Sequence, residues 1–260
     1  MRTLALGALS LLLSLAASGA TLEETIDRSF DVRPGAQLTL SNVNGAVTIH
    51  SSDQPRIRVQ AKKHVEGFGA DAAATAMKEL QVEFSQTGGG LKVVTKTPHD
   101  GANGFFDFLF GGLGSRSVTY DITVPRAANI QVENVNGHIE AADVTGVLKL
   151  ETTNGKIIVT RCAGTLTAES TNGSIRAELL RVTPGTPMTF ETTNGRITLA
   201  LPAGYGAMLD AENTNGSIHT DFPVTTNHAG HHSLQGAING GGPTLHLRTT
   251  NGSIDIQSAK

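Results

Sequence analysis

The stretch ETTNGKIIVTRCAGTLTAESTNGSI, residues 151–175, contains the motif that decides the fold. An Asn-Gly pair stands near its start and again 18 residues later, each time followed by a polar residue and then isoleucine. A fixed period of this length is the signature of a repeat architecture. The pattern occurs in seven segments: SNVNGAVTI (41–49), ENVNGHIEA (133–141), ETTNGKIIV (151–159), ESTNGSIRA (169–177), ETTNGRITL (191–199), ENTNGSIHT (212–220) and RTTNGSIDI (248–256).

Apolar residues around each Asn-Gly pair keep a period of two, which is the pattern of a β-strand with one buried face. The third residue after the asparagine is valine or isoleucine in every copy, and the residues four and six positions before it are also apolar. Residues between these columns, such as Lys156 and Arg176, are polar and predict a solvated face. The asparagines that define the predicted repeat corners are Asn44, Asn136, Asn154, Asn172, Asn194, Asn215 and Asn251.

Two architectures fit such a repeat. In an array of hairpins, each Asn-Gly pair would reverse the chain and join antiparallel strands. In a solenoid, each repeat would be one coil, and equivalent residues of successive coils would stack in parallel sheets. The columns of near-identical residues favour the solenoid, because only stacking places asparagine on asparagine and isoleucine on isoleucine. The sequence therefore predicts an all-β fold, a β-solenoid with repeats of about 18–22 residues.

The repeats divide the chain into two parts of what we expect to be one continuous domain, 21–260. Residues 129–260 predict the regular solenoid. Residues 21–128 predict an irregular N-terminal β-region with a Phe-rich loop. One short helix is expected between Asp71 and Leu80, with Asp71 as its N-cap, because an apolar face recurs there at helical spacing.

The first 20 residues have the layout of a secretory signal peptide. A positive charge at Arg2 precedes the apolar run Leu4–Ala17, and the small residues Ser18–Ala20 follow it. Cleavage is expected near Thr21. The apolar run is shorter than the roughly 20 residues that a spanning helix needs. The sequence therefore predicts an exported protein of the periplasm, the cell surface or the extracellular space.

Composition excludes some classes of function. The formal net charge is −3, which gives no basic footprint for nucleic acid. The single cysteine, Cys162, cannot form an intramolecular disulfide and takes a position that holds Val144 in the preceding repeat. We interpret it as a small buried side chain rather than a nucleophile.

No catalytic or cofactor motif stands out. The chain has no G-x-S-x-G elbow, no phosphate-binding loop, no H-E-x-x-H and no paired cysteines. Three imidazoles, His228, His231 and His232, are close enough in sequence to share a metal ion. Their segment is polar and contains glycine, so we interpret it as a solvated loop. The sequence predicts no metal and no cofactor.

The segment HDGANGFFDFLFGGLGSRS, residues 99–117, interrupts the strand pattern with a cluster of large apolar residues between glycines. It could fold back and close the end of the core. If it is exposed, it is a candidate contact for a membrane surface or a protein, because contiguous apolar patches are rare on soluble monomers. The candidate residues are Phe105, Phe106, Phe108, Leu109 and Phe110.

The sequence resembles the putative-adhesin family of bacterial exported proteins, which is described by β-solenoid repeats. The likeness runs from about Leu22 to Gln257. The resemblance implies the fold and a place in the cell envelope, and it carries over no catalytic residues. Its segments are the T-x-N-G-x-I repeats, PGAQLTLSNVNGAVTI (34–49), YDITVP (120–125) and GGGPTLHLRTTNGSIDI (240–256).

These observations predict an exported, non-catalytic scaffold or adhesin-like protein of the cell envelope. Its partner would be an envelope protein, a membrane surface or a glycan. The alternative is an enzyme that acts on envelope polysaccharide or cell-wall polymer. Such an enzyme would need a cleft with a pair of carboxylates, which the repeats do not provide.

Overall fold

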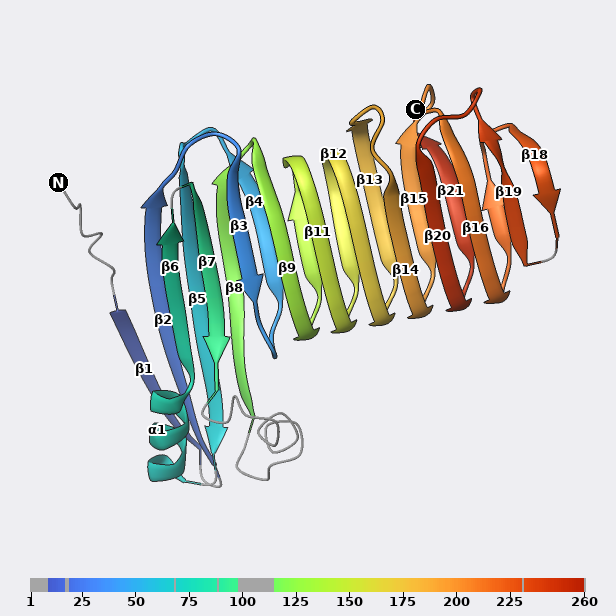
Figure 1. Ribbon diagram of the computed structural model, residues 1–260. Helices are drawn as coiled ribbons and strands as arrows, with labels where there is room; N and C mark the ends of the chain where they lie inside the picture. Colours follow the sequence, from blue (N-terminus) through green and yellow to red (C-terminus); the bar gives the residue numbers. More distant parts are fainter. Residues whose placement is uncertain are drawn as a thin grey trace.

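The computed structural model of the protein describes residues 9–16, 19–67, 69–87, 89–97, 115–230 and 232–259. Two long β-sheets face each other along the molecule, and their inward side chains form one hydrophobic core (Figure 1). Each coil consists of a strand that leads to an asparagine of the motif and a strand that follows it. We call the first set of strands the leading sheet and the second set the trailing sheet.

The leading sheet joins strands that are far apart in sequence. Its inner members pair in parallel, and the outermost strands at both ends, β6, β19 and β18, pair antiparallel with their neighbours. In spatial order the strands are β6 (Gln81–Thr87), β7 (Gly90–Lys96), β3 (Ala36–Ser41), β9 (Ala128–Asn136), β11 (Thr145–Asn154), the second half of β12 (Ile157–Asn172), β14 (Met188–Asn194), β20 (Thr244–Asn251), β16 (Ala207–Asn215), β19 (Ser233–Ile238) and β18 (Val224–Ala229).

The trailing sheet follows the same order of coils. Its first four strands are joined by three antiparallel pairings, and the pairing is parallel from there on. Its strands are β1 (Leu9–Ala16), β2 (Gly19–Asp31), β5 (Arg56–Gly67), β8 (Arg116–Pro125), β4 (Val47–Ser52), β10 (Ile139–Ala142), the first half of β12, β13 (Ile175–Val182), β15 (Ile197–Pro202), β21 (Ile254–Ala259) and β17 (Ile218–Thr220).

Parallel pairing of equivalent residues confirms the solenoid and rules out the array of hairpins. Ile157 of one coil pairs with Ile175 of the next, and Asn154 pairs with Asn172. Both isoleucines are buried, whereas Lys156 and Arg176 are exposed. The alternation in the sequence therefore places the residues on the correct faces, since a strand turns successive side chains to opposite sides.

The seven asparagines form a single hydrogen-bonded ladder at the Asn-Gly corners. Six of the side-chain amides donate to the side-chain oxygen of an asparagine in a neighbouring coil over 2.7–2.8 Å, and the amide of Asn44 donates to the backbone oxygen of Arg116 over 3.1 Å. At one end the ladder joins residues far apart in sequence, since Asn136 contacts Asn44, 92 residues earlier, and at the other end it departs from chain order, because Asn251 lies between Asn194 and Asn215. The spatial order is Asn44, Asn136, Asn154, Asn172, Asn194, Asn251 and Asn215.

A second column of polar side chains lies buried two residues before each ladder asparagine. Thr192 and Thr249 each donate from the hydroxyl to a glycine carbonyl of the neighbouring coil over 2.9 Å, and Thr152 and Ser170 do the same over 3.2 and 3.1 Å. These bonds satisfy polar groups that would otherwise be costly to bury. The threonines beside the asparagines therefore hold adjacent coils together.

The predicted helix is present as α1 (Ala70–Glu79) and packs against β5 and β2 in the N-terminal region. Its buried face contains Ala73, Ala76 and Met77. The prediction that Asp71 caps the helix is wrong. The N-cap is Gly69, which has no side chain to bond the free amides, and Asp71 lies in the first turn instead. There its negative charge lies next to the positive end of the helix dipole.

Candidate functional site

Most residues that the sequence singled out are used to build the stack. The ladder asparagines bond to one another, and Cys162 is fully buried with its sulfur 3.7 Å from the backbone oxygen of Ala141. Burial raises the pKa of the Cys162 thiol, so the thiolate form is disfavoured. A buried thiol of this kind fits the predicted packing role.

The two other candidate sites are only partly described. Phe105, Phe106, Phe108, Leu109 and Phe110 lie outside the described residues, and so does His231. His228 and His232 are exposed, and Nδ1 of His232 lies 3.1 Å from the side-chain oxygen of Asn213. Within the part of the chain that the structure describes, no three histidine, cysteine or acidic side chains form a cluster that could hold a metal ion.

A different histidine is held between two carboxylates on the outer face of the leading sheet. Nδ1 of His246 lies 3.0 Å from a carboxylate oxygen of Asp210, and its Nε2 lies 3.4 Å from one of Glu191. Gln235 donates to the other oxygen of Asp210 over 2.9 Å. These residues come from four neighbouring strands, β14, β20, β16 and β19. Sequence reasoning missed the group, because it depends on the order in which the coils stack.

The outer face of the leading sheet also has a row of glutamates. Glu133, Glu151, Glu169 and Glu191 occupy equivalent positions on successive strands, and Arg248 follows them. Burial, together with the neighbouring charges of Glu151 and Glu191, raises the pKa of Glu169. The row therefore places four carboxylates on neighbouring strands, and Lys149 forms an ion pair with Glu151 over 2.6 Å.

Replacing Glu169 by glutamine is expected to raise the melting temperature at pH 7. A carboxyl group whose pKa is raised on folding destabilises the folded state when it is ionised. That cost is present above the folded pKa and disappears as the pH falls below the unfolded value, about 4.3. The advantage of the variant should therefore shrink between pH 7 and about pH 4. Thermal melts across this range test it, with Glu140→Gln, outside the row, as the control. An advantage that does not depend on pH would contradict it.

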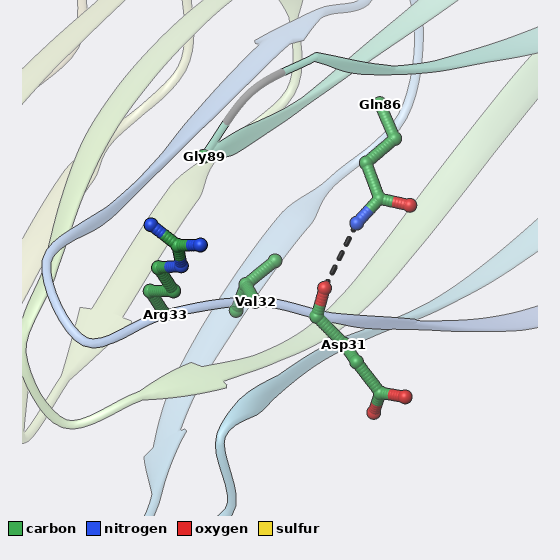
Figure 2. Close-up of a pocket in the computed structure, with 5 residues that line it drawn as sticks. All are labelled: Asp31, Val32, Arg33, Gln86 and Gly89. Atoms are coloured by element: carbon green, nitrogen blue, oxygen red, sulfur yellow. Dashed lines mark hydrogen bonds between the residues drawn. The ribbon is translucent and has the colours of Figure 1, made fainter. Parts of the chain in front are cut away.

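A polar hollow of 510 Å³ lies at the N-terminal end of the leading sheet (Figure 2). Asp31, the last residue of β2, forms one wall with Val32 and Arg33, and Gln86 and Gly89 of the β6–β7 hairpin form the other. The side-chain amide of Gln86 donates to the backbone oxygen of Asp31 over 2.8 Å, which holds the walls together. In Figure 2, Val32 lies between Arg33 and this pair.

A second hollow, of 480 Å³, shares Gly89 with the first and extends along β3 and β7. Gln37, Thr39, Lys92 and Asn129 line it. The two hollows form one polar surface of amides, hydroxyls, two cationic side chains and the carboxylate of Asp31, which we call the N-terminal polar surface. Such groups can bind hydroxyl-rich or anionic ligands.

The architecture and these surfaces define a class of protein, a parallel β-solenoid with a solvated outer face and no helix, among the described residues, long and apolar enough to cross a membrane. Residues 143–257 match the model of the Toastrack DUF4097 family. The match confirms the resemblance to the putative-adhesin family, whose function is not known.

Several solved structures are similar to the chain at low identity. A "putative cell adhesion protein" from Clostridium sporogenes is 12% identical, with a TM-score of 0.49, over 90% of this chain and 99% of that chain. A "putative adhesin" from Bacteroides fragilis is 13% identical, with a TM-score of 0.29, over 90% and 97%. A "putative lipid binding protein" from Parabacteroides distasonis is 12% identical, with a TM-score of 0.32, over 91% and 97%. No curated protein matches the chain.

Proposed function

We propose that the protein is an exported, non-catalytic scaffold of the cell envelope that binds a glycan through its N-terminal polar surface. The observation that carries this proposal is that the side chains shared by the repeats have structural contacts, whereas those of the N-terminal polar surface differ from the repeat pattern. The residues that the repeats share are used in the core and in the asparagine ladder. The N-terminal polar surface has side chains that the repeats do not share, such as Arg33, Gln86 and Lys92.

The chemistry of this surface suits a glycan better than an apolar partner. The amides of Gln37 and Gln86 both donate and accept hydrogen bonds, which matches sugar hydroxyls. Arg33 and Lys92 add positive charge for carboxylate or phosphate groups on the polymer. The apolar leader at residues 1–20 supports delivery of the protein to the compartment where such polymers occur.

The proposal predicts binding without turnover. Purified protein should be retained by immobilised envelope polysaccharide and should release no reducing ends from it. Loss of both cations in Arg33→Ser with Lys92→Ser should weaken binding about tenfold or more, because charge-assisted hydrogen bonds contribute about 1.5–3 kcal/mol each. The matched control is Lys156→Ser with Arg176→Ser, which removes two exposed cations from the solenoid far along the chain.

Two outcomes would overturn the proposal. Reproducible release of reducing ends would establish the alternative, an enzyme that acts on envelope polysaccharide or cell-wall polymer. Equal binding by the two double variants would show that the N-terminal polar surface does not bind the polysaccharide. Proximity cross-linking in fractionated cells then shows whether an envelope protein or the membrane is the partner instead.

A further inference from the structure

Three loops enclose an apolar pocket of 640 Å³ on the edge opposite the Asn-Gly corners. Its walls are the end of β13 with the residues after it, the end of β15 with the residues that lead to β16, and the residues between β19 and β20. The first of these loops is visible at the upper edge of the ribbon in Figure 1. The third loop reaches the pocket because β20 is inserted between β14 and β16. The pocket volume lies within the range of about 300–1,000 Å³ that is typical of small-molecule sites.

The walls of the pocket are mainly apolar. Pro184, Pro202 and Pro243 line it together with Val182 and Leu180. Leu180 is 52% exposed, which is unusual for so large an apolar side chain in this protein. Of the three large hydrophobic side chains exposed within the described residues, Leu180 lines the pocket and Met208 lies beside Gly241 in its wall. Exposed apolar residues around a hollow indicate a surface that a ligand or partner covers when it binds.

A tyrosine in the pocket wall has an unpartnered hydroxyl. Tyr205 is 9% exposed, and its hydroxyl is buried with no hydrogen-bond partner among the described residues. Burial raises the pKa of Tyr205, so the hydroxyl remains a donor. The flanking residues Gly204 and Gly206 permit the loop to move, which would let an acceptor atom reach the hydroxyl. An unsatisfied buried donor in a pocket wall indicates that the ligand brings the acceptor.

The remaining side chains of the pocket define the charge of the ligand. Arg181 lies in the wall and is exposed. None of the described residues that line the pocket has a carboxylate, and Thr183 adds another hydroxyl. The pocket therefore offers donors and positive charge next to apolar walls. A ligand that matches these groups has an apolar chain and, at one end, an anionic group with several hydrogen-bond acceptors.

We propose that this pocket binds a single-chain amphiphile with an anionic head group, its tail against Leu180, Val182 and the prolines and its head near Arg181 and Tyr205. The site lies on different coils from the N-terminal polar surface, so it stands or falls independently of the proposed glycan binding. Octanoate is the probe for the proposed ligand. It is compared with 1-octanol, which has the same tail without charge, and with acetate, which has the head alone.

Tyrosine absorbance gives a direct readout of the pocket. The protein has no tryptophan and two tyrosines, of which Tyr120 is fully buried and hydrogen-bonded to Thr95 elsewhere. Octanoate should produce a saturable difference spectrum that disappears in Tyr205→Phe. Octanol should bind about tenfold or more weakly, because it lacks the charge that faces Arg181. Acetate should give no signal.

Variants locate the site. Leu180→Ser and Arg181→Ser should each weaken octanoate binding, measured by calorimetry, at least fivefold. The matched control is Val147→Ser, which removes another exposed apolar side chain, 54% exposed, from outside the pocket and should bind octanoate like the wild type. Absence of octanoate binding to the wild type would overturn the proposal. Equal losses in Leu180→Ser and Val147→Ser, or binding of octanol as tight as that of octanoate, would also overturn it.

Discussion

Replacing Ile157 by aspartate is expected to abolish the cooperative unfolding transition of the solenoid. Ile157 is fully buried and stacks in register between Ile139 and Ile175. A carboxylate at this position has no partner and must take up a proton, at the cost of a pKa shift of about 3–5 units, or about 4–7 kcal/mol. Loss of the buried apolar side chain adds about 2–3 kcal/mol. This sum is comparable with the roughly 5–15 kcal/mol that stabilises a whole domain.

The neighbouring polar residue provides the control for this prediction. Lys156 precedes Ile157 in the same coil, but its side chain is exposed. Lys156→Ser should change the free energy of unfolding by no more than about 0.5 kcal/mol. Denaturant titrations followed by circular dichroism compare the two variants. Similar midpoints for both would disprove the assignment of inward and outward faces.

Replacing Gly173 by alanine should destabilise the protein nearly as strongly, although only one methyl group is added. A Cβ atom at Gly173 would lie 1.8 Å from the backbone oxygen of Gly155 in the preceding coil. The two coils cannot separate to make room, because the amide of Gly155 donates to the backbone oxygen of Asn172 over 3.0 Å. Relieving the clash breaks corner hydrogen bonds, so we expect a loss of about 3–5 kcal/mol.

A glycine in a loop shows whether the effect comes from stacking. A Cβ atom at Gly204 would meet nothing within 4 Å, and the residue has no left-handed backbone conformation. Gly204→Ala should therefore be neutral, or stabilising by about 0.4–1 kcal/mol, because it restricts the unfolded chain. Thermal melts of both variants decide the matter. If Gly173→Ala melts within a few degrees of Gly204→Ala, the backbones of adjacent coils at Gly173 and Gly155 are not packed too closely for a Cβ atom.

Together these variants describe how the stack is held. The isoleucine column supplies buried apolar area, and the corner glycines let adjacent backbones approach. Hydroxyls of the buried polar column and the asparagine ladder then satisfy the polar groups that this approach brings together. The residues around the Tyr205 pocket take no part in these contacts, because the pocket lies on the edge opposite the Asn-Gly corners.

The sequence by itself determined the structure of a single coil, that is, its two strands, its Asn-Gly corner and its inward-facing residues. The period of two around each Asn-Gly pair predicted which residues point inward, and Ile157 and Ile175 are buried as expected. The repetition of asparagine predicted stacking in parallel, which the pairing of Asn154 with Asn172 confirms. These features are local, since strand alternation and corner chemistry depend on residues within one repeat.

Only the tertiary structure decided the order of the coils and the surfaces that this order creates. Asn251 lies between Asn194 and Asn215 in the ladder, although it comes last in the chain. All repeats have the same Asn-Gly corner, so any one of them could stack on any other in the same register. The motif therefore does not determine which repeat lies next to which. That choice depends on pairing between distant strands. The site around His246 and the pocket around Tyr205 join segments that become adjacent only through this stacking order, which is why the sequence did not reveal them.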